Sequence, residues 1–329
     1  FTSKKQIINR TEILKDIFKE RGLELKEGKR LFYYEGNWWM RGDAVGELGG
    51  PDSEVFYYVG EDDENFGLGM DPEENEDKFL EIGNSVFMQY VKNEEGWEEM
   101  DIENVDFGGG LERIAMVVQG KRDIFETDNF WPIIQKLEGL TSIKYGQDVE
   151  VTRNMRIIAD HIRSGVFLAM DGVEPSNKDQ GYILRRLLRR IVRAGKNLDL
   201  EKDISVELVG IVVEMFSWLY PDLEDKQSKI ERVFSKEEDK FRRTLNKASK
   251  QVDKFLSTLE SPVSTEKIAK QAFTFYQSLG YPEEIFLEDL RSSGFEINAK
   301  EFNKKFKELQ TRHKEKSRKG AKKKFKGGL

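Results

Sequence analysis

The spacing of hydrophobic and polar positions changes near residue 108, from short alternating runs to long amphipathic segments. Residues 1–30 place apolar side chains on one side of a polar segment, which predicts a helix that stops near Gly22. Strand-like runs follow at residues 30–34, 54–59, 84–92 and 97–102. Because no helical pattern separates these runs, the sequence predicts an antiparallel sheet with Gly-rich, acidic connections.

Beyond Gly108 the pattern predicts almost only helices. They are expected at residues 111–118, 129–137, 152–170, 181–194, 204–219, 226–258, 266–278 and 299–316. We place a domain boundary near Gly120, which divides the chain into domains of residues 1–120 and 121–329. The predicted fold class is therefore α+β, an antiparallel sheet followed by a helical domain.

The segment 181–195 has the sharpest division into two faces, since its arginines fall within an arc of roughly 140° and its apolar residues fill the other half. The arginines are Arg185, Arg186, Arg189, Arg190 and Arg193. Guanidinium groups match phosphate geometry and stay charged, which favours a nucleic-acid backbone as partner. The alternative is a solvated basic face paired with local acids.

Composition narrows the possible chemistry. The 329 residues include no cysteine and only two histidines, which excludes disulfides and thiolate metal sites. No stretch has the roughly 18 uninterrupted apolar residues of a membrane span, and the cytoplasm is the expected compartment. The net charge of −7 is unevenly distributed: residues 52–103 hold eighteen Asp and Glu against two Lys, and residues 304–326 hold twelve Lys and Arg against two Glu. This segregation predicts an anionic partner for the basic region.

A triplet of glycines lies between a strand-like run and a helix, in the segment VDFGGGLERIA (residues 105–115). Glycines let a ligand approach the backbone closely, and Arg113 follows in the first helical turn, so an anionic ligand would meet both. A plain turn is the alternative for the glycines. Asp106 could likewise be a helix cap rather than a ligand-binding residue.

The same segment resembles the third motif of class II aminoacyl-tRNA synthetases, and of the alanyl-tRNA synthetase family in particular. Four further blocks resemble that family in order and spacing: GGPDSEVFY (49–57), EIGNSVFMQY (81–90), the region 156–195, and FKGGL (325–329). The resemblance implies a partial class II antiparallel sheet followed by an α-helical tRNA-recognition domain.

For the amino-acid site, the resemblance implies that Asp106 pairs with the ammonium of alanine and that Asn84 holds the amino acid by hydrogen bonds. Trp39 would form an aromatic wall of the pocket, although Trp38 and Trp39 could equally be core residues. Gly83 stands where the family commonly has Trp, which is expected to loosen one wall.

For ATP, the resemblance implies that Arg113 holds the triphosphate and that Gly108, Gly109 and Gly110 form the floor beneath the adenylate. Glu54 and Glu81 are candidates for the ATP side, through Mg²⁺ or the nucleotide. No metal site made of protein ligands alone is expected, and Mg²⁺ would arrive with ATP.

For RNA, the resemblance implies that Asn177 reads the minor groove of the tRNA-Ala acceptor stem. A second reading residue is expected in the loop after Tyr276, where Glu284 aligns with an Asp of the family. The five arginines of segment 181–195 would hold phosphates without reading sequence.

The implied reaction is ATP-dependent activation of alanine and its transfer to tRNA. The family's first two motifs would lie upstream of Phe1, and its editing and C-terminal regions downstream of Leu329. We therefore expect a fragment or split subunit with an N-terminal half as partner. The alternatives are a non-catalytic tRNA-binding protein, or a helical adaptor that binds an acidic protein.

Overall fold

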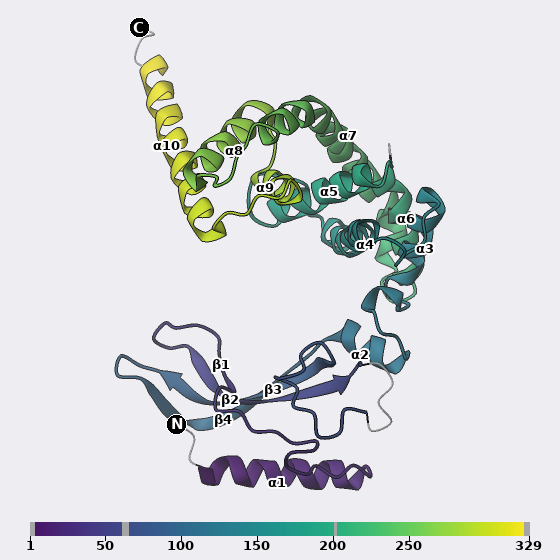
Figure 1. The fold of residues 1–329 in the computed structure, drawn as a ribbon, viewed down its shortest axis with the longest axis vertical. Coiled ribbons are helices and arrows are strands. Elements are labelled where there is room, and N and C mark those ends of the chain that lie inside the picture. Colours follow the sequence, from purple (N-terminus) through teal and green to yellow (C-terminus); the bar gives the residue numbers. More distant parts are fainter. Residues whose placement is uncertain (1–3, 61–65, 201–202, 326–329) are drawn as a thin grey trace. The chain divides into compact units, whose positions relative to one another are not determined.

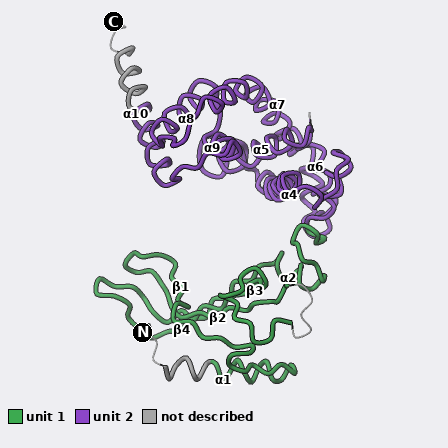
Figure 2. Tube along the Cα trace, in the orientation of Figure 1, with its two compact units in different colours: residues 1–129 green, residues 130–329 purple. Residues whose placement is uncertain are grey.

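The computed structural model describes residues 4–60, 66–200 and 203–325, and describes side chains for residues 11–60, 66–200 and 203–313. The FKGGL block and much of the basic segment 304–326 therefore lie outside the described side chains. The chain forms two compact units, Phe1–Asn129 and Phe130–Leu329 (Figure 2). Each unit is considered by itself below.

The first unit contains a four-stranded antiparallel sheet (Figure 1). Its elements are α1 (Lys4–Glu20), β1 (Trp38–Met40), β2 (Leu48–Tyr58), β3 (Phe79–Lys92), β4 (Trp97–Gly109), α2 (Leu111–Val118) and the short 3-10 helix η1 (Ile124–Glu126). Each strand pairs with the next one along the chain, in the order β1-β2-β3-β4. With the helical second unit, this confirms the predicted α+β class.

Several predicted strand limits differ from the structure, and β3, for example, begins at Phe79, five residues earlier than predicted. Residues 30–34 form no strand, because Gly28 has a left-handed φ of +69° and the chain turns back there, leaving only an isolated bridge between Glu27 and Leu31. Strand β2 begins at Leu48, six residues earlier than predicted, and β4 continues to Gly109. The glycines therefore belong to extended strands and not only to turns.

Close packing explains one of these strand glycines. A Cβ on Gly50 would lie 1.8 Å from the carbonyl oxygen of Phe87, so no larger residue fits there without moving backbone. At the same end of the sheet the ring of Trp38 lies 5.2 Å from that of Tyr90 and 5.4 Å from that of Trp97. Trp38 is thus half-buried in an aromatic cluster.

The second unit is helical. Its elements are α3 (Trp131–Thr141), α4 (Val149–Met170), α5 (Asp179–Asn197), α6 (Ile204–Phe216), α7 (Asp222–Leu256), α8 (Thr265–Leu279), α9 (Glu283–Ser292) and α10 (Ala299–Phe325). Helices α4 and α5 pack along each other, and α7 packs on α4, α5, α6 and α8. On the apolar side of α5, Leu184, Leu188 and Ile191 are buried, which agrees with the predicted division into two faces, although Ile183 on the same side is 45% exposed.

Several features of the second unit differ from the prediction. Helix α7 begins at Asp222, four residues before the predicted start, and α6 ends at Phe216, three residues before the predicted end. Helix α9 was missed, because Pro282 and two glutamates at its start suggest a turn. Glu284 therefore lies in the first turn of a helix, and the expectation that a loop carries it is wrong.

None of the described helices is long and apolar enough to cross a membrane.

Candidate active site and nucleic-acid interface

The register of β2, β3 and β4 collects polar side chains on one face of the sheet. Glu54 lies opposite Asn84, which lies opposite Gly108. In the adjacent row, Asp52 lies opposite Val86, which lies opposite Asp106 on β4. Because directly paired residues share a face, the sheet brings together residues that are up to 54 positions apart in sequence, from Asp52 to Asp106.

Asn84 is the centre of this group. Its side-chain amide Nδ2 donates to Asp52 Oδ2 at 2.8 Å and reaches Glu54 Oε1 at 3.4 Å. Among the described residues, no partner exists for two buried oxygens, Asp52 Oδ1 and Asn84 Oδ1. Buried polar atoms are normally hydrogen-bonded, and both of these are acceptors. The site is therefore suited to a ligand group that donates hydrogen bonds.

Electrostatics favour a positively charged group at the same place. Burial raises the pKa of the Glu54 carboxyl above its usual range, and the neighbouring carboxylates Glu81, Asp52 and Glu73 raise it further. A cation bound nearby would relieve this repulsion. An ammonium group satisfies both requirements, since it is cationic and has three donors.

Asp106 is exposed on β4. The alternative that it caps the following helix is excluded, because α2 has Gly110 as its N-cap and no side chain caps it. The carboxylate of Asp106 is thus left for another role on the face that carries Asp52.

Arg113 lies in the first turn of α2 and reaches back to β3. Its Nη1 donates to the Glu81 carbonyl at 2.8 Å and lies 3.3 Å from Glu81 Oε2. Both side chains are substantially exposed, at 46% for Arg113 and 37% for Glu81, so a phosphate could replace the carboxylate at low cost.

The three glycines before α2 differ in their surroundings. A Cβ on Gly110 would lie 3.0 Å from Cδ of Arg113, so this glycine admits the arginine stem. A Cβ on Gly108 would meet nothing within 4 Å, which leaves open space over the row of Asn84. Gly109 instead faces the ring of Phe107, whose Cε1 would lie 3.0 Å from a Cβ there.

Gly83 also faces the ring of Phe107, since a Cβ on Gly83 would lie 2.9 Å from Cε2 of that ring. Since neighbouring strand residues point to opposite faces, Gly83 does not line the face of Asn84. This corrects the expectation that Gly83 loosens a wall of the amino-acid pocket. Trp39 is half-buried on β1 and pairs with Gly50 of β2.

In the second unit, Asn177 lies in the turn between α4 and α5. Its Oδ1 accepts a hydrogen bond from Arg185. The turn is tight because the backbone N–H of Ser176 donates to the Gly181 carbonyl at 2.9 Å. A Cβ on Gly181 would lie 2.4 Å from the Glu174 carbonyl oxygen, so glycine is required there.

Glu284 lies beside α5, next to a shallow pocket that Tyr182, Arg185 and Tyr276 help to line. Tyr182 donates to Glu284 Oε1 at 2.8 Å, and Arg186 Nε lies 3.4 Å from the same oxygen. Its neighbour Glu283 also lines the pocket, and burial together with the Glu284 charge raises the pKa of Glu283 to about 7.

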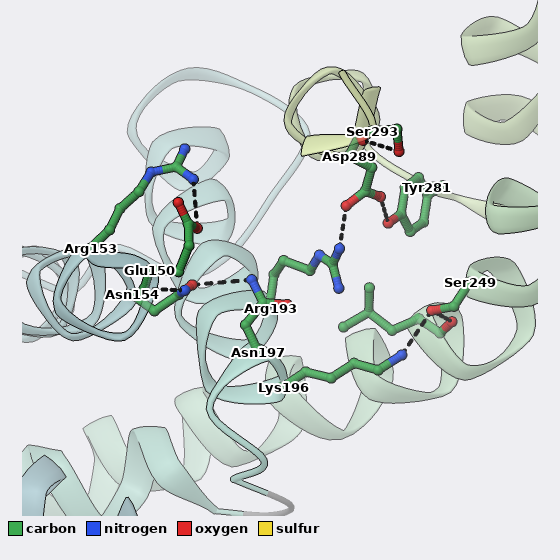
Figure 3. A network of polar contacts seen from close by, with 11 residues as sticks. Glu150, Arg153, Asn154, Arg193, Lys196, Asn197, Ser249, Tyr281, Asp289 and Ser293 are labelled. Atoms are coloured by element: carbon green, nitrogen blue, oxygen red, sulfur yellow. Dashed lines mark hydrogen bonds and ion pairs between the residues drawn. The ribbon is translucent and has the colours of Figure 1, made fainter. Parts of the chain in front are cut away.

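The remaining arginines of α5 are held by acids of other helices. Arg189 lies 2.8 Å from Glu237 of α7, and Arg190 lies 3.1 Å from Glu288 of α9. Arg193 pairs with Asp289, which also accepts from the hydroxyl of Tyr281 (Figure 3). These arginines are therefore paired with acids, as the alternative to a phosphate-binding face predicted. The acids, however, are not local but come from distant parts of the sequence.

The chain is similar to known proteins over most of its length. A family model described as "tRNA synthetases class II (A)" matches residues 12–327. The chain belongs to this family of class II tRNA synthetases. It is 39% identical over 307 residues to an alanine–tRNA ligase of Borrelia hermsii, covering 91% of this chain and 50% of that protein.

Two further relatives, also named alanine–tRNA ligases, come from Streptococcus thermophilus and Thermotoga maritima. Their identities are 36% over 294 residues and 37% over 262 residues, which cover 87% and 79% of this chain. These matches span 33% and 30% of the two relatives. The chain thus spans between about a third and a half of the length of these curated proteins.

Sequence reasoning missed several residues of these sites. Asp52 was read only as part of a motif, although a carboxylate inside a strand is an available signal. Glu237, Glu288 and Asp289, which neutralise the arginines, have no signal in the sequence because only the packing of α7 and α9 on α5 brings them close.

Proposed function

We propose that this chain supplies the alanine pocket, an ATP-binding arginine and acceptor-stem contacts of an alanine–tRNA ligase. The observation that carries the proposal is the pair of buried acceptors, Asp52 Oδ1 and Asn84 Oδ1, on the sheet face that includes Asp106. They fit the ammonium of a free amino acid, and the names of the relatives indicate alanine. Because the chain spans only part of those relatives, the full activity is proposed for it together with the rest of the enzyme.

In the activation step, Asp106 and Asp52 hold the ammonium and Asn84 orients the amino acid, while Trp39 limits the size of its side chain. The alanine carboxylate then attacks the α-phosphorus of ATP, and pyrophosphate leaves. Arg113 releases Glu81 and binds the triphosphate, with Gly108, Gly109 and Gly110 beneath the adenylate. Positioning and charge neutralisation carry the catalysis, since no step needs a nucleophilic side chain.

Mg²⁺ fits the site only in company with ATP. No group of three acidic or histidine side chains within the described part of the chain could hold a metal ion. Glu54 and Glu81 could each add one oxygen to an ion that the phosphates already bind, and the raised pKa of Glu54 marks a place where positive charge is favourable. When bound, the ion would offset the charge of the triphosphate.

In the transfer step, the terminal ribose hydroxyl of tRNA-Ala attacks the aminoacyl carbonyl of the mixed anhydride, the ester bond forms with loss of the hydroxyl proton, and AMP leaves. Asn177 and Glu284 are proposed to contact base edges of the acceptor stem in the shallow minor groove. Arg185 and Arg186 would hold phosphates near them, whereas Arg189, Arg190 and Arg193 are held by carboxylates of α7 and α9. Arg186 is the first candidate because its side chain is 42% exposed.

The test is alanine-dependent pyrophosphate exchange, with the chain alone and with the N-terminal part of a related alanine–tRNA ligase supplied separately. Asp106→Asn should lower kcat/KM for alanine by about 10- to 100-fold, the range for losing one charge-assisted contact. Asp101→Asn is the matched control, because Asp101 is also exposed on β4 but lies outside the rows of Asn84 and Val86. Equal activity of the two variants would contradict the role of Asp106.

A non-catalytic tRNA-binding protein is the second candidate. It is favoured by the exposure of Asp106 on β4, because an enclosed pocket would require more covering than the described residues provide. If tRNA binds but neither sample exchanges pyrophosphate, this second function replaces the first.

A further inference from the structure

Helix α7 carries a continuous basic stripe. At 100° per residue, eight of its Lys and Arg residues fall within an arc of about 80°. They are Lys229, Arg232, Lys236, Lys240, Arg243, Lys247, Lys250 and Lys254, all exposed. No acidic residue of the segment 229–254 falls within this arc, although the segment includes Glu231, Glu237, Glu238, Asp239 and Asp253.

The packing of α7 turns this stripe towards solvent. Phe234, Phe241, Leu245 and Val252 lie on the opposite side of the helix, and each is no more than 1% exposed. Phe241, Leu245 and Val252 belong to the core that α7 shares with α5 and α8. The orientation of the stripe is therefore set by the hydrophobic core, and the stripe is a permanent feature of the surface.

The stripe also lacks internal neutralisation. Within the described part of the chain no ion pair includes any of its eight residues, and the one side-chain hydrogen bond among them joins Arg232 to the Ser228 carbonyl at 3.0 Å. This contrasts with α5, where four of the five arginines have carboxylate partners. Like charges at spacings of three and four residues repel each other, so the stripe is unfavourable for the isolated helix.

The shape and chemistry of the stripe select the kind of anion. From Lys229 to Lys254 it extends about 38 Å along the helix, at about 1.5 Å per residue. It has none of the aromatic or apolar side chains that form the centre of a protein–protein interface. Membrane-surface helices insert an apolar face, and the apolar face of α7 is occupied by the core. A long row of phosphates remains as the fitting partner.

We propose that the stripe of α7 binds the phosphate backbone of an RNA, at a surface distinct from the turn of Asn177 and from Glu284. The stripe positions the RNA without reading its sequence, because lysine contacts to phosphate carry no base information. The proposal rests on the proposed function only in taking tRNA as the RNA.

The experiment compares two variants with equal charge loss. The stripe variant is Lys236→Gln, Lys240→Gln, Lys247→Gln and Lys250→Gln, and the control is Lys26→Gln, Lys29→Gln, Lys121→Gln and Lys267→Gln, which are also exposed lysines. Binding of a tRNA-Ala transcript is measured as a function of salt concentration. The stripe variant should bind at least about 10-fold more weakly, with a salt-dependence slope smaller by about 3, while the control keeps the slope of the original chain.

Other outcomes decide against the proposal. A slope change below about 1 in the stripe variant, or an equal loss in the control, would show that general charge and not the stripe binds RNA. Stronger stripe-dependent binding of poly-glutamate, or of vesicles with anionic lipids, would assign the surface to an acidic protein or a membrane. The exchange assay with Asp106→Asn is independent of these measurements, so it can fail or succeed without affecting this result.

Discussion

At the scale of single residues, the aromatic ring of Phe107 explains why two paired strand positions are glycines. The ring of Phe107 lies across Gly83 of β3 and Gly109 of β4, which are directly paired. A Cβ on either glycine would lie about 3 Å from the ring, closer than ordinary contact. The two glycines are thus explained by one side chain, which is itself 63% exposed.

This predicts a coupling between positions 83 and 107. Gly83→Ala should lower the free energy of unfolding by about 1 kcal/mol in the original chain, because the ring must move. In a Phe107→Ala background the same change should be neutral or stabilising, since glycine is disfavoured in strands. Urea unfolding of the four variants measures this coupling. Gly108→Ala is the control, because a Cβ there meets nothing.

A second residue-scale prediction concerns pH. The pKa of Glu283 is raised to about 7, with Glu284 adding repulsion and Arg186 opposing it. The folded state therefore binds the proton more tightly than the unfolded state, whose carboxyl titrates near 4.3. This contribution to stability is present below the unfolded pKa and is lost as pH rises through about 7.

Between pH 5 and pH 8 we expect the free energy of unfolding to fall by about 2 kcal/mol through this group. Glu283→Gln should remove that part of the pH dependence, as measured by urea unfolding at both values. Glu260→Gln changes an exposed carboxyl and should leave it intact. The same fall in both variants would assign the effect to other groups.

At the scale of elements, α5 is the helix to which the acids of α7 and α9 are anchored. Its buried side packs against the core, and its arginines pair with Glu237 of α7 and with Glu288 and Asp289 of α9. A short helix such as α9 has little helical stability of its own, so these contacts and its buried Phe286 and Leu290 hold it in place.

Asp289 is the strongest of these links, because it serves both Arg193 and Tyr281 and is 8% exposed (Figure 3). Asp289→Ala should lower the free energy of unfolding of the second unit by about 2–3 kcal/mol, since it leaves a partly buried guanidinium and a buried hydroxyl without a partner. Chemical unfolding measures the loss. Glu296→Ala, an exposed acid, should cost less than about 0.5 kcal/mol, and equal losses would contradict the link.

At the scale of the whole chain, the net charge of −7 is the sum of an acidic region and of regions that are strongly basic. Acidic side chains predominate in residues 52–103 of the first unit, whereas the second unit carries the stripe of α7. An average charge would suggest weak binding to nucleic acid, but binding depends on the local density of unpaired cations. The number of basic residues does not predict binding to nucleic acid either, because most arginines of α5 are paired with carboxylates whereas the residues of the stripe are not.

Much of the fold could be predicted from the sequence. The limits of α2 and the amphipathic character of α5 follow from local periodicity. The sheet of the structure is antiparallel, as the sequence predicted. Predictions failed where glycine and proline interrupt the pattern, as at Gly49–Pro51 of β2 and Pro282 before α9. There, pairing with β3 and packing against α5 override the local preference for a turn.

The sequence by itself determined the two-part α+β organisation, the family resemblance and the identity of the polar residues, because these depend on local pattern and composition. Only the tertiary structure decided which of those residues are neighbours. It placed Asp52 against Asn84, and it paired four arginines of α5 with carboxylates up to 98 positions away while leaving the stripe of α7 without ion pairs. Hydrogen bonds and ion pairs act over a few ångströms, and strand register and helix packing alone set those distances.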